Sequence, residues 1–191
     1  MTSASKNIPL KNKTIVLGVS GSISAYKSAL ILRNLSLLGA KVKVCLSSGG
    51  EKFIGAETFR GLTGEAPYAS TYAADSSLGG EPHIKIADEC ELMLVAPASA
   101  SMIARLANGP ADEPVSLTAL NIKSPLFIAP AMSEEMWTHP QVQDAVKLLK
   151  KRGAHFIGPE EGALASGKSG LGRLTEPEAI ANIVVKHFDK T

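Results

Sequence analysis

Small and hydroxyl-bearing residues gather in two short segments that each follow an apolar run. Residues 18–25 read Gly-Val-Ser-Gly-Ser-Ile-Ser-Ala, and residues 97–101 read Pro-Ala-Ser-Ala-Ser. Small side chains let a backbone approach an anion, and the start of a following helix favours a phosphate. With Ser20 at the second glycine position and no Gly-Lys-Ser/Thr, residues 18–25 fit neither a dinucleotide fingerprint nor a Walker loop. They suit a mononucleotide phosphate or, equally, a plain strand-to-helix turn; at residues 97–101 a helix cap is the favoured interpretation.

Two further segments have compositions that suit a ligand or a moving lid. Residues 129–137 follow an apolar run and contain Met132, Met136 and the chain's single tryptophan, Trp137. Such a cluster either covers the core, which is its usual role, or lines a flat aromatic cofactor. Residues 158–173 contain five glycines, so we expect a loop without structure of its own that closes over a substrate.

His83 is a candidate general base, because it follows a proline and precedes an apolar run, although a lone histidine is more often structural. His139 and His155 stand in no motif. The sequence has no H-x-x-x-H, C-x-x-C or paired-carboxylate pattern, so a metal site is not expected. Without a G-x-S-x-G elbow, a serine hydrolase is not expected either.

The elements that must position these segments alternate along the chain. Apolar runs predict strands, buried on both faces, at residues 14–19, 42–46, 92–96, 126–129 and 155–157. Helices are predicted from near Pro177 onward and at residues 23–38, 51–62, 101–106, 113–120 and 141–152. This alternation predicts an α/β protein with an open parallel sheet and helices on both faces. Such sheets bind ligands at the carboxyl ends of their strands, where the serine-rich segments fall.

The composition narrows the class of protein. The chain has 191 residues, 45% hydrophobic and only 5% aromatic, which suits a single domain built as a sheet covered by helices. A net charge of +2 gives no argument for nucleic acid or an anionic membrane, and no apolar run approaches the roughly 18 residues of a membrane helix. Cys45 and Cys90 are expected to be reduced, as in a cytoplasmic protein. Residues 1–13 are polar and are expected to form a flexible leader before one domain over residues 14–191.

Five segments, taken together and in order, resemble the flavin-dependent cysteine decarboxylase family. The first is the strand–helix turn at residues 18–27, and the second is a histidine motif at residues 82–84. The third is a serine segment paired with an Asn-Gly segment, within residues 96–112. The last two are a proline-methionine-to-tryptophan motif at residues 130–137 and a glycine-rich flap at residues 164–174. Each motif alone is weak. Their common order along residues 14–185 carries the resemblance.

The resemblance implies a flavodoxin-like (Rossmann-like), doubly wound, three-layer α/β/α fold that binds FMN, in a homotrimer or a dodecamer of trimers. Sites in this family lie between subunits, so His83 would serve a flavin held by a neighbour. The residues implied in catalysis are His83, Ser133, Met136 and Ser166. Those implied in FMN binding are Gly21, Ser22, Ile23, Ser47, Phe53, Ala98, Ser99, Ala100, Asp112, Ala129 and Met132, with residues 158–173 as the substrate flap.

The chemistry of the family explains these residue types. A cysteinyl carboxylate lacks an electron sink, and oxidation of its CH₂–SH to a thioaldehyde by hydride transfer to flavin provides one, after which CO₂ leaves. A base beside the flavin helps to remove the thiol proton, and the resemblance assigns that region to His83. Two positions depart from the pattern. Ser133 replaces an asparagine that orients the substrate carboxylate, and Ser166 replaces a cysteine tied to re-reduction of the product in the coenzyme A branch.

Three functions therefore stay open. We favour decarboxylation of phosphopantothenoylcysteine in coenzyme A synthesis, with other residues in the roles of the missing asparagine and cysteine. The second function is decarboxylation of the C-terminal cysteine of a peptide during maturation of a ribosomal peptide natural product, which leaves an enethiol and needs no flap cysteine. The third is a non-catalytic, FMN-binding regulatory protein, against which the retained His83 argues.

Overall fold

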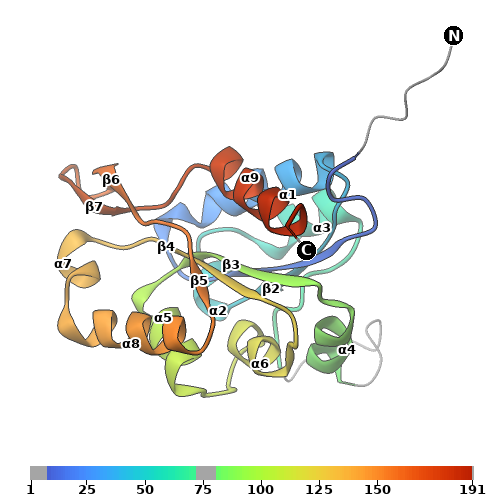
Figure 1. The fold of residues 1–191 in the computed structure, drawn as a ribbon, viewed down its shortest axis with the longest axis horizontal. Helices are drawn as coiled ribbons and strands as arrows, with labels where there is room; N and C mark the ends of the chain where they lie inside the picture. Colours follow the sequence, from blue (N-terminus) through green and yellow to red (C-terminus); the bar gives the residue numbers. More distant parts are fainter. Residues whose placement is uncertain (1–7, 72–80, 191) are drawn as a thin grey trace, which may run out of the picture.

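The computed structural model describes residues 8–71 and 81–190. Five parallel strands form one sheet in the order β2-β1-β3-β4-β5 (Figure 1). These strands are β1 (Thr14–Val19), β2 (Lys41–Leu46), β3 (Leu92–Ala98), β4 (Leu126–Pro130) and β5 (His155–Phe156). The order is that of flavodoxin-like folds, in which β2 is added on one side of β1 and the later strands are added on the other side, beginning with β3. The predicted fold class is confirmed.

Helices cover both faces of this sheet (Figure 1). Those on one face are η1 (Ile23–Tyr26), α1 (Lys27–Leu37), α3 (Ala56–Thr63) and α9 (Pro177–Phe188). Those on the other face are α4 (Pro82–Glu89), α5 (Ala100–Asn108), α6 (Pro114–Asn121) and α8 (Pro140–Lys151). Along β1, Ile15 and Leu17 enter the core under α1 and α9, whereas Val16 enters the core under α4, α5, α6 and α8. Burial on both faces is what a parallel sheet requires.

The predicted and observed helices differ in several places. The helix expected at residues 51–62 is two helices, α2 (Ser48–Glu51) and α3, because Gly55 takes an extended backbone and begins α3 as its N-cap. The helix α4, which carries His83, was not expected. Its proline at the first helical position suits a helix start, but eight residues give a short periodic signal.

The glycine-rich segment at residues 158–173 has structure of its own, so its prediction as a structureless loop is wrong. It contains an antiparallel hairpin of β6 (Glu160–Ala163) and β7 (Ser169–Arg173), which is drawn above the short helix α7 (Glu134–Trp137) in Figure 1. A Cβ added at Gly172 would lie 2.1 Å from the carbonyl oxygen of Met132, and the Met132 N–H donates to the Gly172 carbonyl at 3.0 Å. The missing side chain therefore allows β7 to lie directly against the loop after β4.

Part of the expected leader is packed on the domain. Leu10 is fully buried, and its N–H donates to the Leu38 carbonyl at 2.9 Å. The Lys13 ammonium pairs with Glu91 at 2.8 Å. Residues 8–13 are thus no flexible leader, while residues 1–7 lie outside the described residues. Across residues 8–71 and 81–190, no helix combines the length and apolar character needed to cross a membrane.

Candidate functional site

Two cavities lie side by side at the carboxyl edge of the sheet, because the adjacent residues Gly21 and Ser22 line different ones. The hydroxyl pocket, of about 400 Å³, is lined by Ser20, Gly21, Ser47, Ser48, Gly49, Ser99, Ser101, Met102, Arg105, Asp112 and Glu113. The hairpin pocket, of about 450 Å³, is lined by Ser22, Ile23, Ser24, Tyr26, Lys27, Met132, Ser133, Ala163, Leu164, Ala165, Ser166, Gly172, Arg173 and Leu174.

The floor of the hydroxyl pocket is a close crossing of two backbones. A Cβ added at Gly21 would lie 3.1 Å from the carbonyl carbon of Gly49. Beside the crossing, the buried Ser20 hydroxyl donates to the Pro97 carbonyl at 2.8 Å and accepts from the Ser99 N–H at 2.9 Å. Glycines and a small hydroxyl thus join the loops after β1, β2 and β3 at one point, with space for an anion above them.

Several serines that line the two pockets are helix N-caps. Ser47 Oγ accepts from the Gly50 N–H at 2.9 Å and begins α2, while Ser99 Oγ accepts from the Met102 N–H at 3.2 Å and begins α5. Ser22 Oγ accepts from the Ser24 N–H at 3.3 Å at the start of η1. Capping, the favoured interpretation of Ser99, is therefore confirmed. Because Ser99 also faces a cavity beside a helix start, the same geometry suits a bound phosphate.

The hydroxyl pocket contains one cation and two carboxyl groups. Arg105 pairs with Asp112, which raises the pKa of the guanidinium and lowers the pKa of the carboxyl. Burial raises the pKa of Glu113, whose Oε1 accepts from the Ser116 N–H at 2.7 Å. Within residues 8–71 and 81–190, Glu113 Oε2 has no hydrogen-bond partner. The pocket thus holds one cation, its paired carboxylate and a carboxyl that burial favours in the neutral form.

The hairpin pocket places the flap opposite the loop after β4. Ser166 comes from the turn of the hairpin, whereas Met132 and Ser133 come from that loop. Ser133 Oγ accepts from the Met136 N–H at 3.4 Å and caps α7. The Ser133 hydroxyl is thus partly engaged by the backbone, yet Ser133 still lines the cavity.

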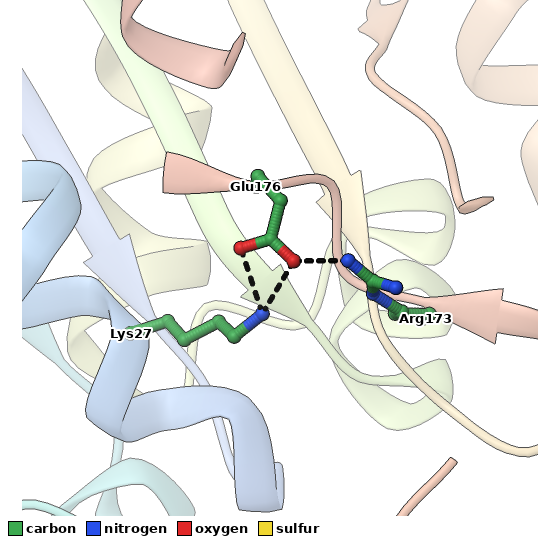
Figure 2. A network of polar contacts seen from close by, with 3 residues as sticks. All are labelled: Lys27, Arg173 and Glu176. Carbon is green, nitrogen blue, oxygen red and sulfur yellow. Dashed lines mark hydrogen bonds and ion pairs between the residues drawn. The ribbon is translucent and has the colours of Figure 1, made fainter. Parts of the chain in front are cut away.

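Three charged residues join the base of the hairpin to α1 (Figure 2). The Lys27 ammonium lies 3.2 Å from Glu176 Oε1 and 3.1 Å from Glu176 Oε2. The Arg173 guanidinium donates to the same carboxylate. The bond from Lys27 and then the bond from Arg173 lower the pKa of Glu176 below its ordinary value. We call these three residues the ion cluster.

The structure brings nine of the predicted site residues into the two pockets. The hydroxyl pocket contains Gly21, Ser47, Ser99 and Asp112, and the hairpin pocket contains Ser22, Ile23, Met132, Ser133 and Ser166. The other six are not lining residues of either pocket. Ala98 and Ala129 are fully buried in strands, and Phe53 and Met136 are about half exposed. The remaining two are Ala100 and His83.

His83 is the second residue of α4, on the opposite face of the sheet from α1. Its Nδ1 lies 3.6 Å from a carboxylate oxygen of Glu81, and 15% of its side chain is exposed. The helix packs against α6 and the sheet rather than against the hairpin. The expectation that His83 acts on a neighbouring subunit's site stays a prediction.

Sequence reasoning missed several lining residues. In the hydroxyl pocket these are Ser20, Ser48, Gly49, Ser101, Met102, Arg105 and Glu113. Ser101 and Arg105 stand four residues apart on α5 and so share one face, which is a signal that could have found them. In the hairpin pocket, Lys27 and Arg173 were given no role, although both fall within the first-turn and flap motifs.

The model of the family described as Flavoprotein matches residues 3–189. The chain belongs to the Flavoprotein family. It is 40% identical over 179 residues to the coenzyme A biosynthesis bifunctional protein CoaBC of Bacillus subtilis, and the matched region is 94% of this chain and 44% of that protein. It is 35% identical over 181 residues to CoaBC of Escherichia coli, and this matched region is also 94% of this chain and 44% of the relative. The chain thus spans less than half the length of these curated relatives.

Solved structures share the fold of this Flavoprotein member. The FMN-dependent cysteine decarboxylase SpaF superposes with a TM-score of 0.80 at 23% identity, covering 94% of this chain and 99% of that one. A PPC decarboxylase mutant complexed with pantothenoylaminoethenethiol gives the same four values. The FMN-dependent cysteine decarboxylase TvaF from thioviridamide biosynthesis has a TM-score of 0.70 at 28% identity, covering 77% and 90%. The flavodoxin-like assignment rests on these likenesses and on the strand order.

Proposed function

We propose that this protein is an FMN-dependent carboxy-lyase that decarboxylates phosphopantothenoylcysteine in coenzyme A synthesis. The observation that carries the proposal is the pairing of two adjoining cavities, one suited to a phosphate and one closed by a hairpin. The relatives named for coenzyme A biosynthesis support this substrate over others. A cytoplasmic location and a homotrimeric or dodecameric assembly belong to the same proposal.

The residues present fit FMN. The missing side chains at Gly21 and Gly49 let the loops after β1 and β2 close together, and both α2 and α5 begin beside the hydroxyl pocket, where helix starts favour a phosphate. Gly21, Ser47 and Ser99 would hold the phosphate, with Arg105 as the nearby cation. For the flavin ring, the adjoining wall offers Ser22, Ile23 and Met132, and Phe53, Ala98, Ala100, Asp112 and Ala129 complete the proposed set.

When bound, the flavin would supply an acceptor for the hydride that leaves the cysteinyl CH₂–SH, which turns that group into the electron sink for loss of CO₂. The chain's own residues orient the substrate and exclude water. Ser133 would donate its hydroxyl to the substrate carboxylate, and Met136 would lie beside it. The hairpin carrying Ser166 would cover the pocket. His83 of a neighbouring copy would accept the thiol proton.

Incubation of the purified yellow protein with phosphopantothenoylcysteine tests this function directly. We expect CO₂ release, with a product that has lost CO₂ alone if the flavin is reoxidised by the enethiol, or CO₂ plus two hydrogens if it is not. Mass spectrometry separates the two products. A preparation that binds no FMN would contradict the proposal, and so would an FMN-loaded protein that leaves this substrate unchanged.

A second candidate is a peptidyl-cysteine decarboxylase, favoured by Ser166. A hydroxyl is a far weaker acid than a thiol and is a poor proton donor for re-reduction. Peptides that end in cysteine would then be converted to enethiols faster than phosphopantothenoylcysteine. An FMN-loaded protein that converts neither substrate would leave the third function, a non-catalytic binding protein.

The role of His83 is tested by His83→Asn. Loss of a general base costs roughly 100-fold or more, so turnover should fall by at least that factor while the flavin absorbance in the visible range stays. His139→Asn is the matched control, because His139 caps α8 through its Nδ1 and asparagine is also a good cap. Unchanged turnover in His83→Asn would refute the assignment.

A further inference from the structure

Two cations and no anion line the hairpin pocket in the described part of the chain. They are Lys27, from the start of α1, and Arg173, from the end of β7. Their common partner, Glu176, comes from the segment between β7 and α9, and its carboxylate lies between the two cations (Figure 2). One carboxylate balances one of two cations, so the cluster keeps one net positive charge beside the cavity.

This charge is held in place rather than free in solvent. Only 17% of the Lys27 side chain is exposed, and its ammonium donates to both carboxylate oxygens of Glu176. A Cβ added at Gly162 would lie 2.9 Å from the Arg173 guanidinium. The absence of a side chain at Gly162 therefore allows the guanidinium to lie against β6. An ammonium has three donors and a guanidinium five, and the bonds to Glu176 use only part of them. A partly buried charge with donors left over favours an anionic partner.

We propose that Lys27 and Arg173 form an oxyanion subsite of the hairpin pocket, and that Glu176 is the positioning residue that holds them together. The inference rests on the proposed function, because the oxyanion belongs to the substrate. It is either the cysteinyl carboxylate or a phosphate elsewhere on the same molecule. Both candidate substrates carry the cysteinyl carboxylate, but the phosphate is present only on phosphopantothenoylcysteine. The subsite therefore discriminates against peptides only if its oxyanion is the phosphate.

Binding measurements on the FMN-loaded protein test the subsite without requiring turnover. Isothermal titration would use pantetheine, which has neither oxyanion, phosphopantetheine, which has the phosphate, and pantothenoylcysteine, which has the carboxylate. We expect one oxyanion-bearing ligand to bind at least about tenfold more tightly than pantetheine, the factor that one charge-assisted bond supplies. The ligand that gains identifies the source. Equal affinity for all three would overturn the proposal.

The variants Lys27→Met and Glu176→Gln should have different effects on oxyanion binding. Lys27→Met should remove most of the tenfold advantage of the oxyanion ligand and leave pantetheine binding unchanged. Glu176→Gln keeps an oxygen that accepts from both cations but removes the negative charge, so the oxyanion ligand should bind as tightly or several-fold more tightly. A purely structural network predicts loss in both variants. Parallel losses would therefore overturn the subsite.

Two controls separate the subsite from a general effect of surface charge and from a role in cofactor binding. Lys147→Met removes an exposed lysine that pairs with Asp144 and should change no affinity. FMN retention, followed by flavin absorbance, should be equal in Lys27→Met and the parent; a loss of FMN would assign Lys27 to the cofactor phosphate and overturn the proposal. Oxyanion binding that depends on Lys27 without CO₂ release would defeat the proposed function alone. CO₂ release with unchanged affinities would defeat the subsite alone.

Discussion

The hydroxyl pocket and the hairpin pocket adjoin one another but are built differently. The hydroxyl pocket takes its walls from the ends of neighbouring strands of one sheet, joined by the buried Ser20 hydroxyl and the Gly21–Gly49 crossing. The hairpin pocket has one such wall. Its other wall is β6 and β7, where exposed and partly exposed residues predominate, held to the domain at Gly172 and at the ion cluster.

This difference separates a fixed cavity from one that can open. A site made of strand ends moves only if the sheet moves, so its helix starts are already in place for an anion. A two-stranded hairpin buries little apolar surface and has a low free energy of local opening. The division suits a cofactor that stays bound next to a substrate that must enter and leave.

Gly172→Val should give the largest effect, because a Cβ would lie 2.1 Å from the Met132 carbonyl oxygen and force β7 off the domain. Misplacement by about 1 Å costs on the order of 100-fold in rate, so CO₂ release should fall by that factor or more. FMN affinity should stay near that of the parent. Steady-state kinetics and fluorimetric FMN titration measure the two quantities separately.

Gly61→Ala is the matched glycine control. A Cβ at Gly61 would meet nothing within 4 Å, and alanine is the better helix former in α3. This variant should keep turnover and gain a little stability. Full turnover in Gly172→Val would show that the docked hairpin is not needed, and the contrast between the two pockets would lose its functional meaning.

Ser99→Ala should give a smaller effect, and this effect should fall on FMN binding in the hydroxyl pocket. It removes a hydroxyl that caps α5 and lines the hydroxyl pocket, so FMN should bind about tenfold more weakly. Loss of the cap should lower the free energy of unfolding by about 1 kcal/mol. Ser36→Ala, at an exposed position of α1, is the control and should change neither. If stability falls but FMN affinity does not, Ser99 is a cap only.

The sequence predicted the strands and loops that build the fixed pocket better than the hairpin of the movable one. Apolar runs and strand-ending serines are local signals, and parallel strands bring their carboxyl ends to one edge, so Gly21 and Ser99 could be placed together. Ser47 was implied by the family resemblance alone. The hairpin was missed because glycines carry no periodic pattern. The ion cluster was missed because Lys27 and Glu176 are 149 residues apart.

The place of His83 was beyond sequence reasoning for another reason. Its motif predicted a role in the site but not the helix α4 that carries it, and this helix lies against α6 instead of the hairpin. In the proposed assembly His83 serves another copy, so the packing of its own chain does not reveal that role.

The smallest expected effect concerns the stability that the ion cluster gives to the hairpin pocket. Lys27 and Arg173 lower the pKa of Glu176, so folding favours its ionised form. A carboxyl with a lowered folded pKa stabilises the protein above its unfolded pKa, about 4.3, and loses that contribution as pH falls through the folded value. The carboxyl is 43% exposed, so screening limits the contribution to about 1 kcal/mol or less at pH 7.

Denaturant unfolding should therefore find Glu176→Gln less stable than the parent at pH 7 and equally stable near the acid limit. Salt should narrow the difference at pH 7. A difference that persists unchanged at acid pH would mean that the Glu176 side chain acts by packing and not by its charge.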